Sequence, residues 1–421
     1  MKSGNRALVV AISRPDSSDH STEEASLNDS YDRHNRPRER RTLILDALRE
    51  RYGDVVRVEH PRESESLQIY ADYQVHDPKM VEFICTAWKK WEALGVGGRD
   101  TGNFHPRFIV TEETKRLGII PPMVPCNMTL HRDEFERLSD SVMGQVGYYC
   151  TDFVTPIVGT LLEELQWDRA VVSLAVDESM AEDLVSDQNS VDPCHGRAVA
   201  YAITTHPGHH SSFSSYGGYC YVNHAALAAV IYQVKFSKNK VAILDVDYHC
   251  GNGTASIFYK DPSVLTISIH CDPNVEYPFH SGYADQTGTG DGEGATLHIP
   301  LPPHTSWEPV YRDALHRAMV AIQEYGAEAL VVSLGLDTHD GDQVATRRAG
   351  FHLKGQDYKD MGFMIGSMAP SNIPICVIQE GGYLMEVVGP TAADVVAGMV
   401  TCLSNRIDHQ PSRGDVAKRK I

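Results

Sequence analysis

Four apolar runs in the chain each lead into residues that could carry out metal-dependent hydrolysis. Buried parallel strands read as continuous runs of Val, Ile and Leu. Ligands of α/β sheets bind outside the carboxyl ends of such strands. We therefore expect the four ends to form one site. The runs and the residues that follow them are 198–204 with His209 and His210, 241–244 with Asp245, Asp247 and His249, 329–334 with Asp337, and 375–379 with Tyr383.

Three of these residues are candidate metal ligands. Asp247 and His249 are two positions apart, and alternate residues of an extended segment point the same way. Asp337 offers a third ligand from another strand end. Two carboxylates and one imidazole with open positions suit a hydrolytic zinc ion, and iron(II) could take the same ligands.

Three further residues could handle protons beside that metal. His209 and His210 have Asp245 and Asn252 as candidate partners. A carboxylate behind one histidine favours its charged form, whereas a neutral amide behind the other leaves that ring free to exchange a proton. Tyr383 follows a Gly-Gly turn and could donate a hydrogen bond to a developing oxyanion, or could simply pack there.

Composition narrows the class of protein. The 421 residues carry a net charge of −18, which argues against a nucleic-acid or anionic-membrane binder and would attract a cationic substrate. Nine cysteines without a C-x-x-C pair favour reduced thiols in a cytoplasmic or nuclear protein. No apolar stretch approaches the roughly 18 residues that a membrane helix needs.

The chain reads as one α/β domain over 1–421. Strand-like and helical segments alternate after residue 198, which predicts a parallel sheet. The segment 14–41 reads as a long polar loop, and 404–421 reads as a short tail. The remaining predicted elements are strands at 7–13 and 54–59 and helices at 42–52, 78–94, about 134–165, 223–236, 307–325, 356–368 and 389–403.

Seven motifs together resemble the zinc-dependent histone deacetylase superfamily, in particular its acetylpolyamine amidohydrolase branch. They cover about half of the chain densely. They are HPGHH (206–210), GGYCYVNHAALAA (217–229), AILDVDYHCGNGTASIFY (242–259), LTISIHCDP (265–273), GYADQTGTGDGEG (282–294), VVSLGLDTHDGD (331–342) and QEGGY (379–383).

The resemblance implies a fold, a metal and residue roles. The fold is the arginase/deacetylase fold, an eight-stranded, mainly parallel sheet between helix layers. The metal is zinc at Asp247, His249 and Asp337. The implied roles are general base and acid for His210, electrostatic neighbour for His209, carbonyl polariser for Tyr383, tunnel walls for Gly218, Tyr219 and Tyr277, and structural potassium binding near Asp245, Asp247, His249 and Ser268.

The sequence departs from the branch at several positions. Thr205-His206-Pro207 and His249-Cys250 stand where the superfamily usually has Arg-Pro-Pro and His-His. Met143 and Val154 stand where acetylpolyamine enzymes carry acids, so a rim acid would have to come from Glu23, Glu24 or Asp29 in the 14–41 loop.

We expect hydrolysis of acetylpolyamines or similar small acetylamines, in a protein that could form a homodimer. The alternatives are a histone or protein lysine deacetylase, an inactive module that binds acyl-lysine, and an arginase-like ureohydrolase with two manganese ions. The last of these would need a richer set of Asp and His ligands than a single D-x-H supplies.

Overall fold

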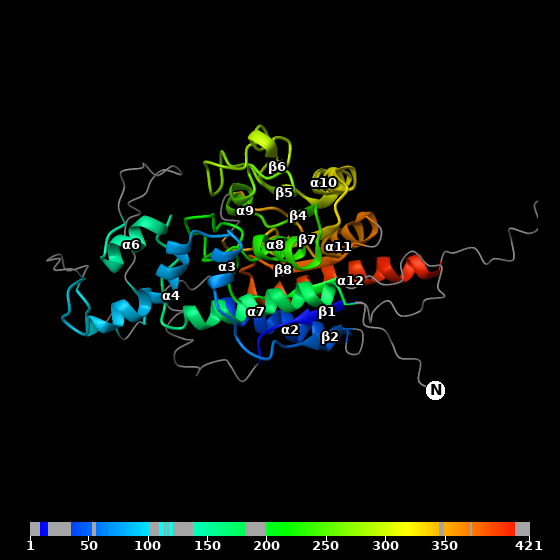
Figure 1. Ribbon diagram of the computed structural model, residues 1–421. Coiled ribbons are helices and arrows are strands. Elements are labelled where there is room, and N and C mark those ends of the chain that lie inside the picture. Colours follow the sequence, from blue (N-terminus) through cyan, green and yellow to red (C-terminus); the bar gives the residue numbers. More distant parts are fainter. Residues whose placement is uncertain are drawn as a thin grey trace, which may run out of the picture.

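Eight strands form one sheet in the computed structural model (Figure 1). The structure describes residues 9–15, 35–52, 56–100, 109–112, 115, 118–120, 138–181, 199–344, 349–370 and 373–408. All seven strand pairings are parallel, and the order is β2-β1-β3-β8-β7-β4-β5-β6. The strands are β1 (Val9–Ile12), β2 (Val56–Glu59), β3 (Val199–Ala202), β4 (Val241–Asp245), β5 (Val264–Cys271), β6 (Thr296–Leu301), β7 (Ala329–Leu334) and β8 (Ile375–Gln379).

Strands β3, β4, β5, β7 and β8 are buried on both faces, and alternate residues enter two separate hydrophobic cores. In β7, Leu330 and Val332 belong to one core, whereas Ala329 and Val331 belong to the other. Side chains of a strand alternate between faces, so an uninterrupted apolar run is what a sheet covered on both sides requires.

Helices form a layer on each face. One core takes apolar residues from α2 (Pro37–Tyr52), α10 (Arg312–Tyr325), α11 (Gln356–Met368) and α12 (Met385–Asp408). The other core takes them from α3 (Gln68–Asp72), α4 (Pro78–Ala93), α6 (Val142–Tyr149), α7 (Leu161–Ser179) and α8 (His224–Phe236). The remaining helical segments are α9 (Asn252–Ile257), η6 (Gly290–Gly292) and η7 (Trp307–Tyr311). Helices α4 and α6 pack together at one end of the molecule (Figure 1).

The four strands that lead into the chemical residues are neighbours at the centre of the sheet, in the order β3-β8-β7-β4. Because these strands are parallel, their carboxyl ends share one edge, as the sequence predicted. The fold therefore brings residues that lie up to 174 positions apart, from His209 to Tyr383, to the same edge.

Predicted boundaries were wrong by more than two residues in three regions of the described chain. Helix α2 begins at Pro37, inside the predicted 14–41 loop, of which residues 16–34 lie outside the described residues. The single helix predicted at about 134–165 is two helices, because α6 ends at Tyr149 and α7 begins at Leu161 and runs on to Ser179. Helix α12 continues to Asp408, past the predicted start of the tail at 404.

Two further predictions concern thiols and membranes. Among cysteines whose side chains the structure describes, Cys85, Cys150, Cys220, Cys250, Cys271 and Cys376 are free thiols. Within the described ranges, no helix combines the length and the apolar character needed to span a membrane.

Candidate active site

The candidate metal ligands meet at the edge of the sheet. Nδ1 of His249 lies 3.3 Å from Oδ1 of Asp247 and 3.1 Å from Oδ2 of Asp337. All three residues are buried, with exposed fractions of 8% for His249 and 0% for both aspartates. Backbone N–H groups hold the carboxylates in place: Gly381 donates to Asp247 over 2.9 Å, and Tyr248 donates to Asp337 over 3.0 Å.

These distances and charges fit a bound cation. In a tetrahedral site with bonds of about 2.0–2.1 Å, ligand atoms lie about 3.3 Å apart, close to the two distances that His249 Nδ1 makes here. Burial and the charge of Asp247 raise the pKa of Asp337 to about 7. Two buried carboxylates that repel each other in this way gain the most from a positive ion between them.

The adjacent histidines have opposite environments. His209 Nδ1 lies 2.9 Å from Oδ2 of Asp245, and His210 Nδ1 lies 2.7 Å from Oδ1 of Asn252. Burial alone would lower the pKa of His209, but the charges of Asp245 and Asp247 outweigh it and raise that pKa to about 10. Burial and the charges of His209 and His249 lower the pKa of His210 well below 6.5.

Contacts from Asp342 and from Arg40 position Tyr383. Its backbone N–H donates to Oδ2 of Asp342 over 2.7 Å. The guanidinium of Arg40, on the buried side of α2, lies 5.6 Å from the Tyr383 ring centroid. Arg40 also donates to the carbonyl oxygens of Gly382 and Thr205, over 3.3 Å each. Burial raises the pKa of Tyr383 well above 10, so its hydroxyl keeps its proton.

Gly218, Tyr219 and Tyr277 lie around the same point. The ring of Tyr277 stands edge-on to His210, with centroids 4.9 Å apart, and the Tyr219 and Tyr383 centroids are 5.6 Å apart. Gly218 has φ of +59°, and a Cβ there would come within 2.3 Å of Cδ2 of His210. Only glycine therefore allows this backbone to approach the histidine.

Two buried acids that sequence reasoning did not assign hold the 204–210 loop. Glu380 accepts hydrogen bonds from the N–H groups of Gly208 and His209, over 2.6 and 3.1 Å. Asp168 accepts from the N–H groups of Thr205 and His206, over 2.6 and 3.0 Å. No local pattern marks these acids, because each acts on backbone at least 37 positions away.

The rim carries apolar side chains at the positions where acids were sought. Met143 is buried in α6, whereas Val154 is 42% exposed beside Phe153, which is 50% exposed. The loop acids Glu23, Glu24 and Asp29 lie outside the described residues.

Ser268 lies one strand away from the histidine pair. Its position in β5 pairs with Asp245 in β4. Its hydroxyl accepts a hydrogen bond from the N–H of Gly251 over 3.2 Å and lies 2.8 Å from Nδ1 of His270.

Comparison with known families matches residues 34–399 to the histone deacetylase domain. The chain belongs to the histone deacetylase family. This family member is 35% identical over 325 residues to acetylpolyamine amidohydrolase 1 of Pseudomonas aeruginosa, covering 77% of this chain and 81% of that protein. It is also 35% identical over 330 residues to the acetylpolyamine amidohydrolase of Mycoplana ramosa, covering 77% and 82%.

Other relatives match in part or by fold alone. Histone deacetylase 8 of Arabidopsis thaliana is 32% identical over 230 residues, 53% of this deacetylase-family chain and 58% of the relative. A crystal structure of acetylpolyamine aminohydrolase from Burkholderia pseudomallei superposes with a TM-score of 0.69 at 23% identity, covering 94% and 99% of the two chains. This superposition confirms the predicted fold.

Proposed function

We propose that the protein is a zinc-dependent amide hydrolase that removes acetyl groups from acetylated amines, preferably acetylpolyamines or similar small acetylamines. One observation carries the proposal. The ligand atoms of Asp247, His249 and Asp337 have the spacing of a tetrahedral metal site, and they lie beside a histidine pair held in opposite charge states.

The metal and the side chains would contribute to different steps of the hydrolysis. Zinc at these ligands would supply a Lewis acid that polarises the amide carbonyl and acidifies the attacking water. Nδ1–H of His210 donates to the amide oxygen of Asn252, which leaves Nε2 unprotonated and able to accept the proton of the water. The same nitrogen then returns the proton to the leaving amine.

Two other residues stabilise the charges that develop. His209 stays positively charged against Asp245, so it favours a negative charge nearby and leaves proton transfer to His210. The neutral hydroxyl of Tyr383 donates a hydrogen bond to the oxyanion that forms from the amide carbonyl. Gly218, Tyr219 and Tyr277 form the walls that hold the acetyl-bearing chain.

A potassium ion and the oligomeric state complete the proposal. Carboxylate, hydroxyl and carbonyl oxygens suit a hard cation, and Asp245 and Ser268 pair across neighbouring strands. These residues would hold structural potassium together with the backbone at Asp247 and His249. Iron(II) at the zinc ligands and a homodimer remain predictions, which metal analysis and solution mass measurement test directly.

Two features support a small cationic substrate. Relatives that match about four fifths of their own length are acetylpolyamine amidohydrolases. The net charge of −18 also attracts cations. The apolar rim at Phe153 and Val154 favours the second candidate, a protein lysine deacetylase.

Turnover on matched substrates separates these candidates. We expect kcat/KM for acetylputrescine to exceed that for an acetyl-lysine peptide, and the ratio to fall at high salt because screening weakens the attraction of a cation. A ratio below one that does not respond to salt would establish the lysine deacetylase instead. Absence of turnover on both substrates in metal-replete protein would leave an acyl-lysine-binding module.

A further inference from the structure

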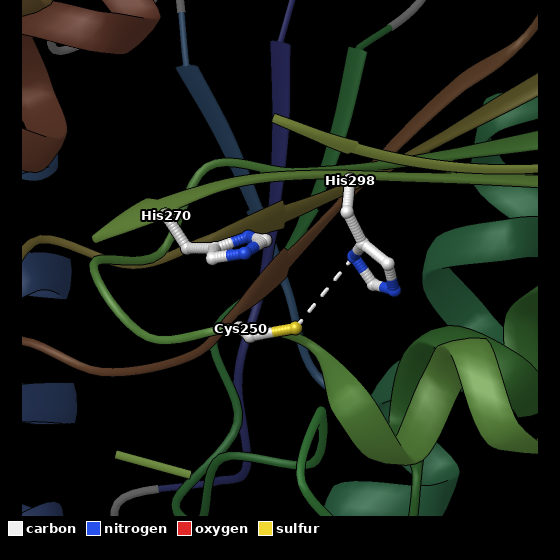
Figure 2. A group of neighbouring side chains, drawn as sticks. All are labelled: Cys250, His270 and His298. Atoms are coloured by element: carbon white, nitrogen blue, oxygen red, sulfur yellow. Dashed lines mark hydrogen bonds between the residues drawn. The ribbon is translucent and has the colours of Figure 1, made fainter. Parts of the chain in front are cut away.

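A second group of potential metal ligands lies beside the candidate active site. Cys250 precedes α9, His270 lies in β5 and His298 lies in β6 (Figure 2). One ligand atom from each residue lies within 4.8 Å of the other two. Sγ of Cys250 is 3.7 Å from Nδ1 of His298. All three side chains are buried, with exposed fractions of 0–2%.

Strand register places these side chains on one face. Ser268 pairs with His298 across β5 and β6, and His270 follows Ser268 by two positions. Ser268 and His270 therefore point to the same face of the sheet as His298. Figure 2 shows His270 and His298 on the side of the sheet that faces Cys250. The arrangement is built by the sheet rather than by a surface loop.

Backbone at Gly282 closes the group. Gly282 has φ of +106°, and a Cβ there would come within 2.6 Å of Nε2 of His270 and 3.0 Å of Sγ of Cys250. The carbonyl of Gly282 accepts a hydrogen bond from His270 over 2.9 Å. The missing side chain thus leaves the thiol and the imidazole facing each other.

The ligand chemistry suits a thiophilic divalent ion. One thiolate and two imidazoles are typical zinc ligands, and the same set binds cobalt(II) and copper. Burial lowers the pKa of His270 to about 4 and that of His298 to about 3, so neither ring must lose a proton before binding. A cavity with room for about one water molecule adjoins the cluster along His298 and Ser268.

We propose that Cys250, His270 and His298 form a second transition-metal site that takes Zn²⁺ or a chemically similar ion. The ion forms a bond to the sulfur and displaces the thiol proton to solvent, and His298 donates a nitrogen lone pair. Nε2 of His270 gives up its hydrogen bond to the Gly282 carbonyl and donates its lone pair, while the ring proton moves to Nδ1 and is donated to the Ser268 hydroxyl. A water molecule would complete the four-fold coordination that zinc prefers. The site shares no ligand with Asp247, His249 and Asp337, and it does not depend on the proposed function.

A metal ion at this site would affect the segment 249–252, which also belongs to the candidate active site. Cys250 directly follows His249, and two residues later Asn252 bonds to His210. Ser268 links the two regions, because its hydroxyl contacts both Gly251 N–H and His270. An ion on Cys250 would therefore restrain the segment that carries one zinc ligand and the partner of His210.

Cobalt(II) substitution tests the site directly. The Asp247–His249–Asp337 group contains no thiolate, so a sulfur-to-cobalt charge-transfer band in the near ultraviolet distinguishes an ion bound by a cysteine from an ion in that group. We expect full-length wild-type protein to bind about two cobalt ions per chain and to show this band. Cys250→Ser should abolish the band and lose one ion, whereas Asp337→Ala should lose one ion and keep the band.

Two further variants keep the test decisive. His298→Gln retains a polar side chain and should weaken cobalt binding at the thiolate site by at least about tenfold. Cys220→Ser is the matched control, because Cys220 also lies within 4.8 Å of two potential ligands, His209 and Glu380, and this variant should keep the band. A wild type without the band, or a band that survives in Cys250→Ser and disappears in Cys220→Ser, would overturn the proposal. Deacetylation by protein with one cobalt ion and no band would uphold the proposed function while rejecting this site.

Discussion

Two clusters that meet at the peptide bond between His249 and Cys250 have opposite electrostatics. The first, made by Asp247, His249 and Asp337, is rich in carboxylate oxygen. The second, made by Cys250, His270 and His298, is built of sulfur and nitrogen. Burial in the first cluster confines negative charges that repel each other. Burial in the second keeps its imidazoles neutral, and it raises the pKa of the Cys250 thiol.

This difference in charge indicates which buried cluster requires a bound ion. Unpaired buried charge is expensive, so the carboxylate cluster is stable only with a cation or a proton in it. The side chains of the neutral cluster already have hydrogen-bond partners. His270 bonds to the Ser268 hydroxyl and to the Gly282 carbonyl, and Cys250 bonds to His298. We therefore expect metal at the first cluster to be tightly held, and metal at the second to exchange with the surroundings.

The largest expected effect comes from the carboxylate cluster itself. Asp337→Ala removes one of three protein ligands and should lower kcat/KM by about 10⁴-fold, because a metal Lewis acid contributes several kcal/mol. Metal analysis should show one ion fewer per chain. Asp340→Ala is the control, since Asp340 is 42% exposed and bonds to His352 on the surface. Full activity and full zinc content in Asp337→Ala would show that the first cluster is not the site of the catalytic metal.

The histidine pair tests whether the charged and neutral sides of the site have separate tasks. His210→Ala should lower kcat by about 10³-fold, because it removes the group that we propose accepts and returns the proton. His209→Ala should have a smaller effect, since His209 supplies charge and does not transfer the proton. Steady-state kinetics of both variants measure this difference. Equal losses would show that the pair acts as one unit.

Tyr383→Phe should fold normally and lose about 10²-fold to 10³-fold in kcat, the range for one oxyanion donor. The Michaelis constant should change less, because the hydrogen bond strengthens in the transition state. The ring contact with Arg40 is retained in this variant. Unchanged kcat would assign Tyr383 a packing role only.

The smallest expected effect is on the stability of the fold, and it comes from Glu164, a buried acid that is paired with protein side chains. Glu164 is bonded by Arg38 and lies 2.7 Å from Nε2 of His206. Burial opposes its charge, but His206 and Arg38 outweigh burial and lower the Glu164 pKa from 4.5 to about 2. Ionised Glu164 therefore stabilises the fold above pH 4.5 by about 3 kcal/mol, and this contribution is lost as pH falls toward 2.

Unfolding of Glu164→Gln tests that contribution. The variant should lose up to about 3 kcal/mol of unfolding free energy at pH 7, and its difference from wild type should shrink near pH 3. Denaturant titrations at the two pH values measure it. Glu163→Gln, at a side chain that is 40% exposed, should stay within about 0.5 kcal/mol of wild type. A Glu164→Gln difference that does not vary with pH would contradict the ion-pair account.

Much of the sheet could be predicted from sequence because its strands are continuous apolar runs. The bounds of β7, β8 and α11 are those predicted. The start of α2 was missed because its first turns are rich in arginine, which usually marks a solvated segment. Arg40 and Arg41 are nevertheless buried, and Arg40 bonds to backbone far away in the chain.

The residues that converge at the candidate site could be picked out because they follow strand ends, whereas the residues that hold them in place could not. Asp168 sits in the middle of α7, where an acid normally faces solvent. Asp168 accepts hydrogen bonds from the backbone N–H groups of two loop residues, 37 and 38 positions later in the chain. No sequence pattern indicates that these N–H groups need a side-chain acceptor. The break between α6 and α7 was missed as well, although Pro156 and the turn around Asp152 lie within it.

The contact between Arg40 and Gly382 has a consequence for biosynthesis. During synthesis, the carbonyl of Gly382 that Arg40 binds follows helix α2 by more than 300 residues. The N-terminal helix must therefore wait, with its guanidinium unpaired on that side, until the last strand has emerged. The Arg40 contact behind Tyr383 should consequently form only after the segment that carries Gly382 has emerged.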